Sequence, residues 1–248
     1  MTSTAIQLGI VLLLAHLVSD FLLQPHALLK HKKRVCGLAI HSLINGAAAY
    51  LLLASWSEWL VPVLIAVSHF LIDFAKQRLR RHTQVIFAVD QLLHLTVIAL
   101  VIGYSLLPRG ITPGWFTILP PGADKVFAYA AAVILLIPVG GIVVGLLVQP
   151  FQQQIKEHYL KKQKEPVEGL ENGGKVIGWL ERALIAVFIL ANQYAGIGFL
   201  IAAKSIFRFG EFKESENRKE AEYIIIGTFA SFLYAILVSL ALKWVLGN

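Results

Sequence analysis

The stretch IQLGIVLLLAHLVSDFLL, residues 6–23, decides the fold class of this chain. It is apolar along nearly all of its length and comes close to the roughly 20 residues that a helix needs to cross a bilayer. Residues 125–148 and 223–246 form apolar stretches of the same kind. Across its 248 residues the chain is 57% hydrophobic and only 15% charged, with a mean hydropathy of +0.69. This composition excludes a water-soluble enzyme and predicts an all-α, polytopic transmembrane helical bundle.

The first apolar stretch is expected to be a retained helix and not a cleaved signal peptide. It is longer than the apolar region of a signal peptide, contains His16 and Asp20, and has neither a basic leader nor a small-residue cleavage site. The chain has one cysteine, Cys36, which excludes an intramolecular disulfide and a cysteine-rich metal site.

Apolar stretches separated by polar and helix-breaking residues predict about eight spans. They cover residues 5–24, 36–54, 60–76, 85–107, 125–149, 175–192, 195–209 and 222–246. Of the 22 Lys and Arg residues, 18 fall on one side of the predicted bilayer, three on the other and Arg182 inside a span. Because basic residues collect on the cytoplasmic side, both termini are predicted to be non-cytoplasmic. The same rule explains the net charge of +7, so no nucleic-acid partner is expected.

A change in the polar residue types near residue 150 predicts two membrane modules. The intramembrane His and Asp residues precede this point, whereas Glu, Lys and Arg residues follow it. Residues 1–150 are therefore predicted to form a five-span N-terminal module, and residues 175–248 a three-span C-terminal module. Between them, residues 151–174 begin with apolar residues mixed with lysines and glutamines, a pattern typical of a cytoplasmic amphipathic surface segment.

Seven ionisable side chains lie inside the first four predicted spans, where each needs a partner or a function because burial in a membrane is costly. Six of them form pairs spaced four residues apart, so each pair shares one helix face. The seven are His16 and Asp20, His69 and Asp73, Asp90 and His94, and the single His41. Counted from the cytoplasmic end of each span, they fall at similar depths. We therefore expect them to occupy one layer in the cytoplasmic half of the bundle.

These residue types indicate a metal site. Neutral imidazoles and carboxylates are the ligands that zinc, manganese and iron prefer, and we expect a divalent metal, zinc above the others. The expected ligand pool is His16, Asp20, His41, His69, Asp73, Asp90 and His94. A metal that activates water near the headgroups would permit hydrolysis of a lipid ester, amide or phosphodiester, with Asp20, Asp73 or Asp90 available as the catalytic base.

Two other interpretations of the same seven residues stay open. The pairs could neutralise each other and fix helix packing in a non-catalytic membrane scaffold. Alternatively, they could bind protons or a cation in a coupled transporter.

Further polar residues are candidates for supporting roles. Those predicted to orient the ligands are Gln24, Asn45, Lys76 and Gln91. Those predicted to bind a substrate anion are Arg182, Lys204 and Arg208. An ion pair between Glu181 and Lys204, or between Arg182 and Glu222, is the simpler interpretation of the C-terminal set. The small residues predicted to permit close helix contacts are Gly140, Gly141, Gly145, Gly196 and Gly198.

The motif HLVSDFLLQ at residues 16–24, the basic loop after it, His41, HFLIDFAK at 69–76 and DQLLH at 90–94 together resemble a bacterial inner-membrane family. It is catalogued as domain of unknown function 3307, and the resemblance covers roughly the first 105 residues. The later segments IGWLER at 177–182, KSIFRF at 204–209 and EYIIIGT at 222–228 resemble the C-terminal extension of longer members. Membership implies a multi-pass protein of the bacterial inner (plasma) membrane and no particular activity.

A looser similarity, in the membrane-embedded His and Asp motifs alone, links the chain to integral-membrane metal-dependent hydrolases, including the ceramidase-like superfamily. We therefore expect a metal-dependent hydrolase that acts on a lipid or lipid-linked substrate from the cytoplasmic leaflet, with membrane lipids as its partners. A proton- or cation-coupled transporter is the alternative, and a scaffold the third possibility.

Overall fold

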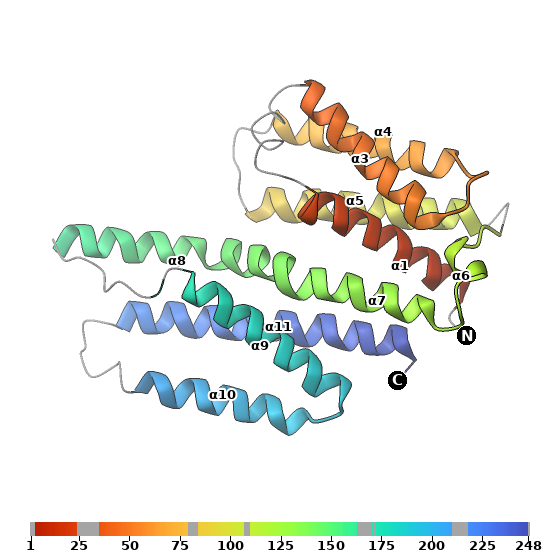
Figure 1. Ribbon diagram of the computed structural model, residues 1–248. Helices are drawn as coiled ribbons and strands as arrows, with labels where there is room; N and C mark the ends of the chain where they lie inside the picture. The colour runs from red at the N-terminus through yellow and green to blue at the C-terminus, as the bar shows by residue number, and fades with distance from the viewer. Residues whose placement is uncertain are drawn as a thin grey trace. The chain divides into compact units, whose positions relative to one another are not determined.

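The computed structural model describes residues 3–23, 35–78, 84–106, 110–162, 170, 172–209 and 218–247, and every regular element in these ranges is a helix (Figure 1). The predicted all-α fold class is therefore confirmed. Six helices are long and apolar enough to cross a membrane. They are Thr4–Leu22, Val35–Leu53, Leu60–Gln77, Gln84–Leu106, Ala123–Leu160 and Lys219–Leu246. The predicted total of eight spans and the predicted side of the two termini stay predictions.

Contacts divide the chain into two compact units, each described here by itself. Unit 1 comprises Met1–Ile134 and Val245–Asn248, and unit 2 comprises Leu135–Trp244. The three-part domain division predicted from the sequence stays a prediction.

Unit 1 is built around four helices that surround one interior. Its elements are α1 (Thr4–Leu17), η1 (Val18–Leu22), α3 (Val35–Leu53), α4 (Leu60–Gln77), α5 (Gln84–Leu106), α6 (Trp115–Ile118) and α7 (Ala123–Ile134). Helix α3 packs against α1 and α4, α5 packs against α4 and α1, and α7 packs against α1. Each of these four helices, α1, α3, α4 and α5, therefore packs against two of the others, so that together they form a closed ring (Figure 1, red to yellow).

The interior of unit 1 is apolar at one end and polar at the other. Leu12 of α1, Leu53 of α3, Val61 of α4 and Val101 of α5 are buried together. Each lies nearer to the helix end that the topology predicts to be non-cytoplasmic, whereas the His and Asp residues lie nearer to the other end. Gly46 of α3 permits the close contact with α4, because a Cβ there would lie 2.9 Å from the Cβ of Ala66.

Unit 2 contains η2 (Leu135–Val139), α8 (Gly140–Lys162), α9 (Gly173–Leu190), α10 (Tyr194–Phe209) and most of α11 (Arg218–Leu246). Its core comprises Leu136, Ile185, Ala186, Ile189, Phe232 and Ala235. These residues come from η2, α9 and α11, so the core joins helices that are far apart in the sequence.

The glycines of unit 2 have two different roles. A Cβ on Gly140 would lie 2.9 Å from Arg182 Nε, and a Cβ on Gly196 would lie 2.7 Å from Phe188 Cδ1, which confirms that both permit close packing. A Cβ on Gly141 would make ordinary contact at 3.8 Å. The prediction is wrong for Gly145 and Gly198, because a Cβ there would meet no described atom within 4 Å.

A candidate metal centre in unit 1

The first helix ends in a π-helical turn that presents Asp20 to the interior. In this turn the Leu23 N–H donates to the Val18 carbonyl oxygen at 2.8 Å. Single π turns occur often at functional sites because they redirect the side chains that they carry. The buried Ser19 hydroxyl lies 2.8 Å from the Ala15 carbonyl oxygen and also contacts Asn45 Oδ1 of α3. The turn is thus held both by its own helix and by α3.

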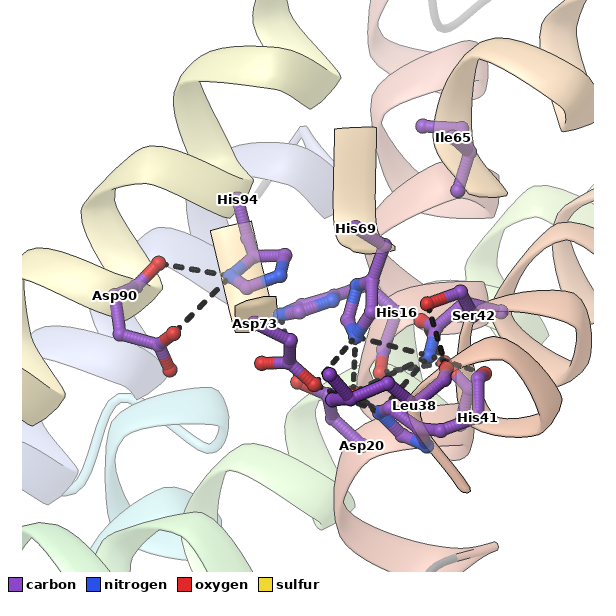
Figure 2. Close-up of polar contacts among 12 residues, drawn as sticks. His16, Asp20, Leu38, His41, Ser42, Ile65, His69, Asp73, Asp90 and His94 are labelled. Carbon is purple, nitrogen blue, oxygen red and sulfur yellow. Dashed lines mark hydrogen bonds and ion pairs between the residues drawn. The ribbon is translucent and has the colours of Figure 1, made fainter. Parts of the chain in front are cut away.

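Asp20 meets two imidazoles from neighbouring helices. Its Oδ1 lies 3.0 Å from His41 Nε2 and 3.4 Å from His69 Nε2. On α4, Asp73 Oδ2 lies 3.7 Å from His69 Nε2, one helical turn away, and 3.9 Å from His41 Nε2. Figure 2 shows the Asp20, His41 and His69 side chains directed toward one another, with Asp73 beside them.

The remaining three residues join this group through ring contacts. The His94 ring lies 4.2 Å from the His69 ring and 5.1 Å from the His16 ring, centroid to centroid. His16 Nε2 also lies 3.9 Å from Asp20 Oδ2, and His94 Nδ1 lies 3.9 Å from Asp90 Oδ1. The structure therefore brings all seven predicted residues into one contiguous layer, called the His/Asp cluster below.

The His/Asp cluster is almost completely enclosed. His41 is fully buried, the other three histidines are 3–6% exposed, and the side chain of Asp20 is 10% exposed. With neutral imidazoles, its three carboxylates carry three negative charges. The ammonium of Lys76, 2.6 Å from Asp90 Oδ2, supplies one positive charge. Buried charge requires compensation, so the excess of two negative charges suits a divalent cation.

Three sets of residues have ligand atoms close enough to hold a metal ion. They are His16 with Asp20 and His69, His41 with His69 and Asp73, and Asp73 with Asp90 and His94. Within each set the ligand atoms lie within 4.8 Å of one another. Tetrahedral zinc with bonds of about 2.0 Å places its ligands about 3.3 Å apart. Small side-chain shifts would therefore close any of the three sets around an ion.

His94 carries the clearest sign of a missing partner. Its Nδ1 lies 2.8 Å from the Asp90 backbone carbonyl oxygen. Because a carbonyl oxygen can only accept a hydrogen bond, Nδ1 must be the donor and carries the hydrogen. In the neutral ring, Nε2 then presents a lone pair. It is buried and has no hydrogen-bond partner among the residues that the structure describes, and the same holds for Asp90 Oδ1. A buried polar atom without a partner costs about 1–3 kcal/mol, and a cation at the lone pair of His94 Nε2 would remove that cost for the imidazole.

Three of the four residues predicted to orient the ligands contact them. Asn45 Nδ2 lies 3.3 Å from Asp20 Oδ1 and from the Nε2 atoms of His41 and His69. Gln91 lies between His16 Nε2, 3.3 Å from its Oε1, and Asp90 Oδ2, to which its amide donates at 3.2 Å. Lys76 is the third. Gln24 lies outside the described residues.

Ser19 is the contacting residue that the sequence reasoning missed. Serines in membrane helices commonly bond their own backbone, so the residue type alone carried no signal. Ser19 lies between His16 and Asp20, and its position next to Asp20 was the feature of the sequence that could have indicated a contact with the cluster.

The residues predicted to bind an anion belong to unit 2, not to the unit that carries the His/Asp cluster. Lys204 Nζ forms an ion pair with Glu181 Oε1 at 2.7 Å, as the simpler interpretation expected. Arg182 donates to the Leu136 and Ile137 carbonyl oxygens and to the Ser231 hydroxyl. The side chain of Arg208 lies outside the described part of the chain. An anion site beside the metal stays a prediction.

Comparison with known proteins identifies the segment that holds the cluster. Residues 8–112 match the model of a family described as "Protein of unknown function (DUF3307)", and this segment contains all seven residues of the His/Asp cluster. No curated protein and no solved structure matches the chain.

Proposed function

We propose that this chain, which belongs to the DUF3307 family through its residues 8–112, is an integral-membrane, metal-dependent hydrolase. Its substrate would be a lipid or lipid-linked molecule reached from the cytoplasmic leaflet of the bacterial inner membrane. The observation that carries the proposal is that two buried atoms, His94 Nε2 and Asp90 Oδ1, have no hydrogen-bond partner in the described part of the chain although they lie in a layer of imidazoles and carboxylates.

The ligand set best suited to an ion is Asp73, Asp90 and His94, because it contains both of these atoms. His69 lies next to it, with Nε2 3.7 Å from Asp73 Oδ2, and would complete a four-ligand shell or give way to a water molecule. This mixture of nitrogen and oxygen donors favours zinc, with manganese or iron as alternatives. When bound, such an ion would polarise a carbonyl or phosphoryl group and activate water for attack.

Asp20 is the residue that we assign as general base. Its Oδ1 is held by His41 and Asn45, which fixes the carboxylate in one orientation. Its Oδ2 lies 3.9 Å from His16 Nε2, and we assign it as the oxygen that takes a proton from water. Asp20 is also more exposed than the other six members of the cluster, as a group that meets substrate should be.

A lipid substrate follows from where the cluster lies along its helices. The six apolar helices favour a membrane location, and large apolar side chains such as Leu43, Leu71 and Leu92 are exposed on their outer faces. The distribution of Lys and Arg assigns the cluster to the cytoplasmic half. Lys76, 30% exposed and bound to Asp90, stands at headgroup depth, where it would meet a polar lipid group.

The apolar core of unit 1 favours hydrolysis over transport. A carrier for protons or cations needs a polar path that continues to the opposite side of the membrane. Beyond the cluster, Leu12, Leu53, Val61 and Val101 fill the space between the described helices, and each is at most 5% exposed. Among the described residues, these apolar side chains interrupt a polar path toward that side of the membrane, which favours a hydrolase over a carrier.

Metal content is the first test. We expect about one zinc, manganese or iron ion per chain in detergent-purified protein, measured by inductively coupled plasma mass spectrometry. His94→Ala and the nearly isosteric Asp90→Asn should lose the ion, whereas His158→Ala, which removes an imidazole from α8 outside the cluster, should retain it.

Circular dichroism and size-exclusion chromatography would establish that each variant is folded. Wild-type protein that binds none of the three metals after reconstitution would rule out the hydrolase. If metal is present, release of product from a panel of ester, amide and phosphodiester lipids, abolished in Asp20→Asn, would identify the reaction.

A further inference from the structure

Unit 2 contains a cavity that the His/Asp cluster does not use. Its volume is about 810 Å³, and its walls come from α8, α9, α10 and α11. Ligand pockets in proteins have volumes of roughly 300–1,000 Å³. The cavity follows α8 from Gly141 to Gln152, a length of about 16 Å at 1.5 Å per residue. It is therefore long enough for an extended ligand.

Glycines keep this cavity open. Gly145 of α8 and Gly174 of α9 line it, and a Cβ added at either position would meet no described atom within 4 Å. Glycines in membrane helices commonly bring two backbones into contact. These two glycines leave space instead, so any larger residue here would reduce the volume without a clash.

The buried end of the cavity presents hydrogen-bond donors. Arg182 is 3% exposed and lines the cavity. A guanidinium group has five N–H donors. Nε donates to the Leu136 carbonyl oxygen, Nη1 to Ser231 Oγ at 3.1 Å and Nη2 to the Ile137 carbonyl oxygen at 3.3 Å. One N–H on each of Nη1 and Nη2 therefore has no acceptor among the described residues.

Both Nη atoms lie close to glycines of the lining. A Cβ on Gly178 would lie 3.1 Å from Nη1, and a Cβ on Gly141 would lie 3.8 Å from Nη2. The guanidinium is also held by η2, whose Leu136 and Ile137 carbonyl oxygens accept from Nε and Nη2. Arg182 is thus fixed in place, with the fork geometry that binds carboxylate or phosphate in a bidentate manner.

The charges of the lining also favour an anion. Lys175, Arg182 and Lys204 are positive and Glu181 is negative, and Glu181 is already paired with Lys204. An excess of two positive charges is left in a wall that is otherwise mostly apolar, with Val144, Val148, Leu200 and Ile224. A ligand that matches this wall has one acidic group and an apolar body.

We propose that the cavity of unit 2 binds an anionic phospholipid, with a phosphate oxygen on the free N–H pair of Arg182 and an acyl chain along Gly145 and Gly174. The membrane is the source of the ligand because α8 and α11 form part of the apolar, span-length helices that line it. This site lies within unit 2 and does not depend on metal binding or hydrolysis in unit 1.

A cavity-filling variant tests the proposal. In the full-length protein in neutral detergent, we expect phosphatidylglycerol to stay bound in native mass spectrometry and to raise the thermal midpoint, while phosphatidylcholine does neither. Gly145→Leu should weaken phosphatidylglycerol binding by about tenfold or more, because it removes the space beside the charged hydrogen bonds. The matched control is Gly198→Leu in α10, where an added side chain also meets open space but does not line the cavity.

Gly174→Leu supplies a second filling of the same cavity from α9, in case Gly145→Leu fails to fold. Equal retention of the two phospholipids, or retention unchanged in both filling variants, would overturn the proposal. Inorganic phosphate is the third probe. Phosphate that stabilises the wild type as well as phosphatidylglycerol does would also overturn it, because the ligand would then be a soluble anion.

Discussion

The two units of this chain bury polar groups of opposite character. The His/Asp cluster of unit 1 gathers acceptors and an excess of negative charge, and its buried atoms His94 Nε2 and Asp90 Oδ1 have no hydrogen-bond partner among the described residues. In unit 2, Arg182 is a donor that backbone carbonyls hold from one edge and that leaves two N–H groups on the other. The first arrangement suits a cation and the second suits an anion. Buried groups of either kind persist only where something satisfies them.

His94 and Arg182 also differ in how far the packing of their units depends on them. His94 bonds the described chain only through Nδ1, to a carbonyl of its own helix, so unit 1 does not depend on its Nε2 for packing. Arg182 bonds η2 and α11, so unit 2 depends on it. Removal of each side chain should therefore have different effects on stability.

Arg182→Leu should give the largest effect. It leaves the Leu136 and Ile137 carbonyl oxygens without their donor, and we expect unit 2 to lose about 3 kcal/mol or more of unfolding free energy. His94→Leu, measured without metal, should lose less than about 1.5 kcal/mol. Denaturant unfolding in detergent micelles measures both, and equal losses would contradict the distinction between the two residues.

Metal should stabilise unit 1 and leave the Arg182 site unaffected. At a zinc concentration 100 times the Kd, we expect the unfolding free energy to rise by about 2.7 kcal/mol. A chelator should reverse this gain, and His94→Ala should not show it. A shift of the same size in His94→Ala would mean that zinc binds elsewhere on the chain. Differential scanning fluorimetry with and without zinc is the measurement.

Loss of an orienting residue should have a smaller effect than loss of a ligand. Asn45→Leu removes the amide that contacts Asp20, His41 and His69, and we expect metal affinity to fall by about 10- to 100-fold. Competition with a fluorescent chelator gives the Kd. Gln154→Leu, which removes an exposed amide from α8 in unit 2, is the control and should leave the affinity unchanged.

The smallest effect expected is also opposite in sign. Lys76 Nζ occupies Asp90 Oδ2 at 2.6 Å and competes with a metal for that carboxylate. Lys76→Met should therefore tighten metal binding severalfold. Without metal it should reduce stability by no more than about 1 kcal/mol, because Lys76 is partly exposed to solvent. Weaker metal binding in Lys76→Met would show that the ammonium supports the site and does not compete for it.

Much of unit 1 could be predicted from the sequence because helical periodicity is local. A long apolar run predicts a membrane helix from neighbouring residues alone. A spacing of four residues places His69 and Asp73 on one face of that helix, whatever surrounds them. The alternation of basic loops then predicts the direction of each helix, and the direction predicts the depth of each polar pair. Those steps predicted one layer of seven residues, and the structure brings the seven together.

Local sequence patterns were therefore enough to predict the helical class, the apolar span-length helices and the composition of the polar layer. Only the tertiary structure decided which atoms of that layer lack partners, because His94 Nε2 is defined by what the other helices bring to it. The tertiary structure also decided that Arg182 binds carbonyl oxygens 45 and 46 residues earlier in the chain. It further decided that Gly145 lines a cavity, whereas Gly140 permits close packing against Arg182. The physical reason is that hydrogen-bond satisfaction and free volume depend on atoms from helices remote in sequence, which no local pattern specifies.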